Sequence, residues 1–198
     1  MVNVAQTGHD GRQPNGDAFM AKFFDHIDEA LADFINRQHV FFTASAVEEG
    51  RVNLSPKGMD CLRILGPRRI AYLDLTGSGN ETSAHMEANG RLTVMFCAFD
   101  GAPLILRAYG TAQIRRLGSQ GYDDLIGHFV EHVGARQIVD MEIQALQTSC
   151  GYAVPLMQFE GHRPNLLRWA EKKGEEGLTN YRHAHNRVSI DGLRTGWD

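Results

Sequence analysis

Alternating apolar and polar positions in the middle of the chain predict a series of short β-strands. In residues 52–55 and 104–111, apolar or small side chains occupy one face, and most side chains on the other face can form hydrogen bonds. A hairpin is indicated where the turn-forming stretch DGAP, residues 100–103, separates two apolar runs. The expected strands cover residues 39–47, 52–55, 70–75, 91–99, 104–115, 138–146 and 153–159.

Apolar residues recur at helical spacing before and after this strand-rich region. The spacing predicts helices over residues 19–37 and 122–133, and a short helix over residues 80–88. From residue 164 onward the chain is charged and helical in pattern, with Trp169 as an apolar anchor. Because only one short helix interrupts the strands, the pattern favours a mainly β fold with flanking helices, either an antiparallel barrel or a sandwich.

The composition is consistent with one folded domain, and the net charge limits the classes of partner to be expected. The 198 residues suffice for one domain, expected over residues 18–198 with a helical extension from about residue 163, after a flexible polar tail at residues 1–17. The net charge of −4 offers no basic excess for nucleic acid or an anionic membrane. The first residues contain no apolar leader and the three cysteines are widely spaced, which predicts a cytoplasmic protein with reduced thiols.

The stretch TGSGN, residues 76–80, joins an expected strand to an expected helix. Ser78 and Glu81 fit the S-x-x-E capping box, and Asn80 is an equally good helix cap. Free N–H groups at a helix N-terminus can also bind phosphate, and the Thr76 and Ser78 hydroxyls could add donors. Two interpretations follow for this loop: a capped turn alone, or a phosphate site.

Polar side chains share one face on two of the expected strands. Asn53 and Ser55 lie on the same face of one strand, and the turn that follows carries Lys57. Arg107 and Tyr109 share a face of another strand. Such faces are typical of half-exposed strands, and they would equally line a groove for a polar planar ligand.

Three segments, in this order and spacing, resemble the pyridoxamine 5'-phosphate oxidase-like family, the FMN-binding split barrels. They are FFTASAVEEGRVNLSPKG, RIAYLDLTGSGNETSAHMEANGRLTVMF and LILRAYGTAQIRR. Two later segments, CGYAVPLMQFEG and WAEKKGEEGLTNYRHAHNRVSIDGL, look like the C-terminal extension of a bacterial subgroup. The resemblance implies a six-stranded antiparallel Greek-key split barrel and a homodimer with one FMN per subunit in a cleft at the subunit interface.

The same resemblance implies cofactor-binding roles by position. The FMN phosphate would be bound from the second strand of the barrel and from the loop after the YLDL strand, and the isoalloxazine ring would lie beside that strand. Arg107, on a later strand, is the candidate for stabilising negative charge on reduced flavin. The implied cofactor-binding residues are Asn53, Ser55, Lys57, Tyr72, Leu73, Asp74, Thr76, Ser78, Asn80 and Arg107.

The sequence departs at two places from the members of this family that oxidise pyridoxamine phosphate. The stretch SGNE, residues 78–81, stands where those enzymes carry a Ser-Arg-Lys cluster, so a weaker phosphate grip is expected unless Lys57, Arg63 or Arg68 compensates. The Arg-Leu-Ala-Pro ending is absent as well. Pyridoxamine phosphate is therefore not the expected substrate.

The resemblance leaves two classes of activity. The leading hypothesis is an FMN-dependent oxidoreductase that transfers hydride between flavin N5 and an unidentified small substrate or nicotinamide. The alternative is a non-catalytic flavin- or haem-binding protein, such as a carrier, sensor or scavenger. A deazaflavin in place of FMN, and an empty dimerisation module, are further alternatives.

Two histidine pairs raise the question of a metal site, and neither pattern supports one. His128 and His132 stand four residues apart on one helix face without an obvious third ligand. His183 and His185 lie in a charged segment, where a substrate or haem contact is the alternative to a solvated surface. Exposed histidines are expected for both pairs, and no metal is expected.

Overall fold

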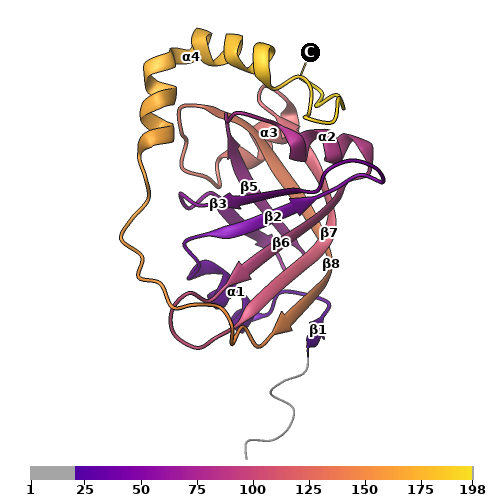
Figure 1. Cartoon of the computed structure of the whole chain (residues 1–198), viewed down its shortest axis with the longest axis vertical. Helices are drawn as coiled ribbons and strands as arrows, with labels where there is room; N and C mark the ends of the chain where they lie inside the picture. Colours follow the sequence, from indigo (N-terminus) through magenta and orange to yellow (C-terminus); the bar gives the residue numbers. More distant parts are fainter. Residues whose placement is uncertain (1–20, 198) are drawn as a thin grey trace, which may run out of the picture.

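The computed structural model describes residues 21–197, which are built on one antiparallel sheet with flanking helices (Figure 1). The strand order is β3-β2-β6-β7-β8-β5-β4, and β1 pairs with β8 beside this path. The expected tail at residues 1–17 lies outside the described residues. The strands are β1 (Lys22–Phe24), β2 (Phe41–Ser45), β3 (Asn53–Lys57), β4 (Leu62–Gly66), β5 (Arg69–Leu75), β6 (Arg91–Cys97), β7 (Ile105–Arg116) and β8 (Ala135–Ser149), and the helices are α1 (Glu29–Asn36), α2 (Glu81–Ala88), α3 (Gln120–Ile126) and α4 (Asn165–His185).

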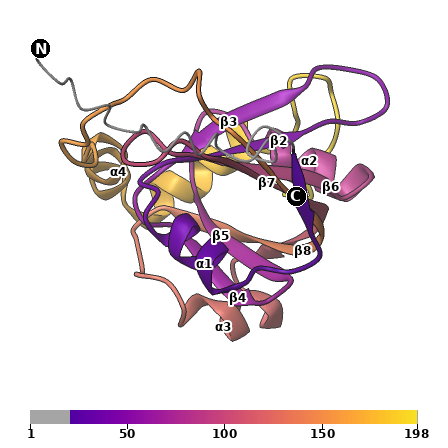
Figure 2. The ribbon, with the colours of Figure 1, turned by 90° about the horizontal axis from the view of Figure 1, so that it is seen from below.

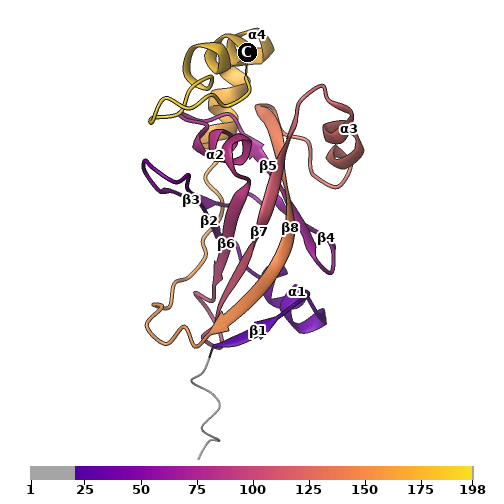
Figure 3. The ribbon, with the colours of Figure 1, turned by 90° about the vertical axis from the view of Figure 1, so that its right-hand side faces the viewer.

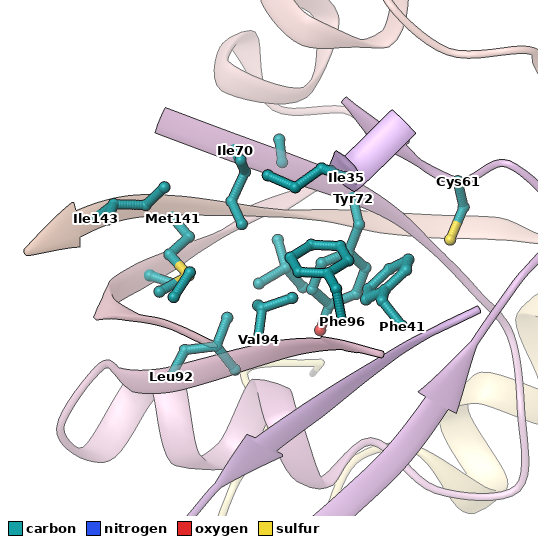
Figure 4. Packing of buried hydrophobic residues seen from close by; sticks show 14 of the residues in the cluster. Ile35, Phe41, Cys61, Ile70, Tyr72, Leu92, Val94, Phe96, Met141 and Ile143 are labelled. Carbon is teal, nitrogen blue, oxygen red and sulfur yellow. The ribbon is translucent and has the colours of Figure 1, made fainter. Parts of the chain in front are cut away.

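The sheet coils around a hydrophobic core, and its strands surround the interior in the view from below (Figure 2). Alternate side chains of β5 and β6, such as Tyr72 and Phe96, point inward and pack together, and α1 adds Ile35 to the same cluster (Figure 4). The longest pairing joins β7 to β8 and contains a bulge at Gly110, where any Cβ atom would collide with the Glu142 carbonyl oxygen. The prediction of a mainly β fold with flanking helices is confirmed.

The helix predicted over residues 19–37 is shorter than its apolar spacing suggested. Helix α1 begins after Asp28, whose carboxylate accepts a hydrogen bond of 2.8 Å from Leu31 N. Phe23 and Phe24 belong instead to β1, which pairs with β8 at Gln147 and Leu146. The prediction was wrong here because pairing with a neighbouring strand outweighed a local pattern that also fits a helix.

Two further expectations about elements were wrong, and one strand was missed. Residues 153–159 form no strand, and β4, which pairs with β5, was not predicted. Helix α3 ends at Ile126, with Gly127 as its C-cap, rather than continuing to residue 133. The described sheet has eight strands, so the expected count of six is not confirmed.

Helix α4 is bent and lies across one end of the sheet (Figure 1). The bend is at Gly174, whose φ of 66° falls in the left-handed region that glycine tolerates. The Trp169 ring meets Tyr181 across the bend at 5.0 Å between centroids, so Trp169 does anchor the two halves of this helix. Among the helices within residues 21–197, none is long and apolar enough to cross a bilayer.

Candidate functional site

A cleft of about 850 Å³ opens at the end of the sheet that lies beneath α4 and α2. It is formed where β3, β5 and the loop before α2 meet the C-terminal segment, which are segments far apart in the sequence (Figure 1). Its volume lies within the range of roughly 300–1,000 Å³ that small-molecule sites span. The residues predicted for cofactor binding that line it are Asn53, Ser55, Lys57, Leu73, Asp74, Ser78 and Asn80.

The loop at residues 76–80 presents unpaired backbone donors to this cleft. Thr76 fixes its start, because both its amide N–H and its hydroxyl donate to Gly134 O at 2.8 Å. Within the described part of the chain, the N–H groups of residues 77–80 have no hydrogen-bond partner. Helix α2 starts directly afterwards, so the partial positive charge of its N-terminus is added to these donors. An anion is the ligand that such an arrangement suits.

Asn80 adds a buried side-chain donor to the same loop. Its side chain is 2% exposed, and its Oδ1 accepts a hydrogen bond of 2.8 Å from Gln137 Nε2. Its Nδ2 is buried without a partner among residues 21–197, and Asn80 makes no side-chain cap to α2, contrary to the expectation from sequence. A buried donor without an acceptor is costly, so a ligand oxygen at this position would relieve that cost.

A buried ionic group forms the floor of the cleft. Asp74 accepts hydrogen bonds from Lys57 Nζ at 3.0 Å, from Arg136 Nε at 2.8 Å and from Gln137 Nε2 at 2.9 Å. Burial alone would raise the pKa of Asp74, but the two cations outweigh it and hold this pKa well below its usual range. Lys57 and Arg136 are therefore fixed in place, with Lys57 at the lining of the cleft.

The polar face predicted for β3 points into the protein, and its apolar face points out. Asn53 Nδ2 donates to Ser45 Oγ at 3.2 Å and to Thr82 Oγ1 at 3.0 Å, and Ser55 Oγ donates to Asn53 Oδ1 at 3.2 Å. Leu54 is 64% exposed. The alternation was read correctly, and the inward polar face makes one wall of the cleft.

Three residues predicted for the site lie away from the lining of the cleft. The Thr76 hydroxyl is buried and accepts a hydrogen bond of 2.8 Å from Arg182 Nε, so it positions the loop. Tyr72 is buried in the core, where burial raises the pKa of its hydroxyl. Arg107 lies on the outer face of β7 and donates to Ser149 Oγ at 3.1 Å. No contact tests their predicted cofactor roles, which stay predictions.

Of the three cations considered for phosphate compensation, only Lys57 reaches the cleft. Arg63 is bound to Asp60 and to the His128 carbonyl. Arg68 donates to Ile143 O at 3.1 Å. Among these three, Lys57 alone therefore lies where it could contact a ligand in the cleft.

Several residues of the cleft were not predicted from the sequence. Arg136 is the second residue of β8, and residues 188–190 belong to the C-terminal segment. Cys61 also lines the cleft, but burial raises the pKa of its thiol to about 12, which keeps it protonated and unreactive. For Arg136, the sequence shows only an arginine just before an apolar strand pattern. That pattern does not show that the start of the strand lies at the cleft.

The two histidine pairs lie at the surface or close to it. Across residues 21–197, no group of three or more histidine, cysteine or acidic side chains is arranged to hold a metal ion. His183 and His185 are both exposed, but His185 lines the cleft and its ring lies 4.5 Å from that of Tyr181. The expectation that both histidines face solvent holds, with one of them beside the candidate site.

The coiled antiparallel sheet, with a loop of unpaired backbone donors at one end, defines a barrel of the split-barrel type. The chain belongs to the pyridoxamine 5'-phosphate oxidase family, whose model, described as pyridoxamine 5'-phosphate oxidase, matches residues 27–150. The pyridoxamine 5'-phosphate oxidase family protein ustO of Aspergillus flavus is 36% identical over 192 residues, which cover 88% of this chain and 77% of that relative. The resemblance inferred from the sequence is confirmed.

A solved structure shows the same kind of fold. A variant of HupZ from Group A Streptococcus has 21% identity and a TM-score of 0.50, over 62% of this chain and 98% of its own. This likeness shows the fold alone. An FMN-binding protein from Syntrophomonas wolfei has 16% identity and a TM-score of 0.41, over 64% of this chain and 84% of its own.

Proposed function

We propose that this protein is an FMN-dependent oxidoreductase whose cleft binds the FMN phosphate at residues 77–80. The observation that carries this proposal is the set of unpaired backbone N–H groups in that loop, together with the unpartnered Nδ2 of Asn80. An anion bound there would satisfy these donors at the N-terminus of α2. Membership of the pyridoxamine 5'-phosphate oxidase family supports a flavin nucleotide as the source of that anion.

The buried charges beside the loop suit a phosphate that is held mainly by hydrogen bonds. Lys57 contributes positive charge at the lining, but Asp74 neutralises part of it. Glu81 lines the cleft too, and its carboxylate is occupied by Ile190 N at 3.0 Å. The phosphate would therefore be bound by short amide and hydroxyl contacts rather than by a cationic cluster. This agrees with the absence of the Ser-Arg-Lys cluster at residues 78–81.

The flavin, when bound, supplies hydride transfer at N5, and the protein contributes binding and electrostatics. In this cleft, Asp74 fixes the Lys57 ammonium, and Leu73 provides an apolar surface beside it. Ser78 can donate its hydroxyl to the phosphate. The substrate or nicotinamide that exchanges hydride would approach from the open side of the cleft.

We also propose a homodimer with the flavin at the subunit interface, as the resemblance to the family implies. The outer face of β6, β7 and β8 is not covered by a helix in the view of Figure 3. Phe42, Met95, Arg107, Gln147 and Phe23 form one row across β2, β6, β7, β8 and β1, and Phe23 is 69% exposed. A second subunit on this face would cover the apolar members of this row, which are Phe23, Phe42 and Met95. Sedimentation would then give twice the chain mass of 22.0 kDa, and a single-chain mass would contradict the dimer.

Anaerobic reduction separates the oxidoreductase from a non-catalytic binder. The protein is loaded with FMN and mixed with NADH or NADPH, and the absorbance of oxidised flavin is followed at about 450 nm. Bleaching within seconds is expected if the cleft admits a hydride donor, because the nicotinamide gives up hydride as the flavin gains it. Bound flavin that stays oxidised with both donors, and with other small reductants, would favour the carrier, sensor or scavenger.

A further inference from the structure

The last residues of the chain fold into a small hairpin, residues 187–195, that forms one wall of the cleft. Val188 and Arg194 form a bridge, and Thr195 N donates to Arg187 O at 3.1 Å. The turn passes through Gly192, whose φ is 83°. We call this segment the C-terminal hairpin.

Contacts from helix α2 and from the loop between β2 and β3 hold the C-terminal hairpin against the barrel. Ile190 N donates to the Glu81 carboxylate at 3.0 Å, next to the loop at residues 77–80. Arg51 N, in the loop between β2 and β3, donates to Asp191 Oδ2 at 2.7 Å, and the two side chains form an ion pair. On the far side, Ser83 Oγ of α2 donates to Thr195 O at 2.7 Å. The position of the hairpin backbone is therefore fixed by the folded protein.

Its apolar side chains are left in contact with solvent at the cleft. Val188 is 52% exposed and Ile190 is 68% exposed, although Ser189 between them is buried. All three line the cleft, as does Leu166 at the start of α4. The bend at Gly174 returns the chain to this cleft, so both ends of α4 border it. Apolar side chains that are held rigidly at a cleft gain free energy when an apolar ligand covers them.

Charge in the cleft favours the same class of ligand. Lys57 and Arg136, the lysine and arginine that line it within residues 21–197, both pair with Asp74. Once the loop at residues 77–80 holds one phosphate, no unpaired lysine or arginine of the described chain remains in the cleft for a second anion.

We propose that the C-terminal hairpin is the substrate-binding wall of the cleft, and that it selects an uncharged, apolar organic molecule. Val188, Ile190 and Leu166 supply the contacts. Glu81, Arg51 and Asp191 act as positioning residues that fix the wall. The inference rests on the proposed function in that bound flavin would form the opposite wall, yet the apolar wall itself is present in the chain without it.

Two matched probes test this inference on the full chain, with and without FMN. Calorimetry compares 2-naphthalenemethanol, which is uncharged, with 2-naphthoate, which carries a carboxylate on the same ring. The alcohol is expected to bind saturably and about tenfold or more tighter than the acid. The double variant Val188→Ser/Ile190→Ser is expected to weaken binding of the alcohol by about tenfold or more, and Val130→Ser, at an exposed apolar residue outside the cleft, to leave it unchanged.

FMN affinity, titrated on the same variants, keeps this inference separate from the proposed function. The double variant should keep its FMN affinity within about twofold, since the phosphate donors lie in another segment. Equal binding of the two probes, no saturable binding of the alcohol, or a double variant that binds it as well as the parent would overturn the inference. If FMN fails to bind while the alcohol behaves as expected, the proposed function fails and the apolar wall stands.

Discussion

Replacing Asn80 by aspartate is expected to raise the Kd for FMN by about a hundredfold or more. The variant removes the unpartnered Nδ2 donor and places a carboxylate where the phosphate would lie. The hydrogen bond from Gln137 Nε2 to the side-chain oxygen can still form in the variant. Quenching of flavin fluorescence on titration gives the Kd.

Riboflavin and a distant asparagine provide the controls for Asn80→Asp. Riboflavin lacks the phosphate, so its Kd should change far less than that of FMN. Asn180→Asp adds the same charge on an exposed face of α4 and should change neither Kd. If Asn80→Asp weakened FMN and riboflavin equally, the phosphate would not lie at this loop.

Replacing Asp74 by asparagine is expected to lower the free energy of unfolding by about 3–5 kcal/mol. Asp74 is the shared partner of Lys57 and Arg136, and the variant leaves the buried Arg136 guanidinium without its counter-charge. Urea denaturation measures the change. Asp60→Asn, which breaks an exposed pair with Arg63, should cost less than about 1 kcal/mol.

The free energy of unfolding at low pH should also depend on Asp74. The pKa of Asp74 is lower in the folded protein than in the unfolded chain, where it is about 3.9. Its contribution is therefore present above about pH 4 and is lost as pH falls towards the folded-state pKa. The parent should lose stability more steeply below pH 4 than Asp74→Asn does. Parallel pH profiles for the two proteins would show that protonation of Asp74 does not cause the loss of stability in acid.

Local patterns predicted the parts of the site that depend on neighbouring residues. The glycines and hydroxyls of residues 76–80 indicated a loop with free donors, and alternation placed Asn53 and Ser55 on one face. Both inferences hold because strand periodicity and turn chemistry act over a few residues. Which face of β3 turns inward was not predictable, because hydrogen bonds to Ser45 and Thr82 decide it.

Other parts of the site depend on contacts between distant segments. Arg182 reaches Thr76 from α4, and Arg136 reaches Asp74 from β8. No local pattern encodes these pairs, since each depends on how α4 and the sheet are arranged. The C-terminal hairpin is a similar case. Val188 and Ile190 lie at the cleft only because Glu81 and Arg51 hold the hairpin backbone there, and the local sequence does not encode those contacts.

The central claim is that the loop at residues 77–80 binds the phosphate of a flavin nucleotide. The most direct measurement compares the affinities of the purified full chain for FMN and riboflavin by fluorescence quenching. The phosphate contacts predict saturable FMN binding about a hundredfold or more tighter than riboflavin binding. No saturable FMN binding, or equal affinities for the two flavins, would contradict the claim.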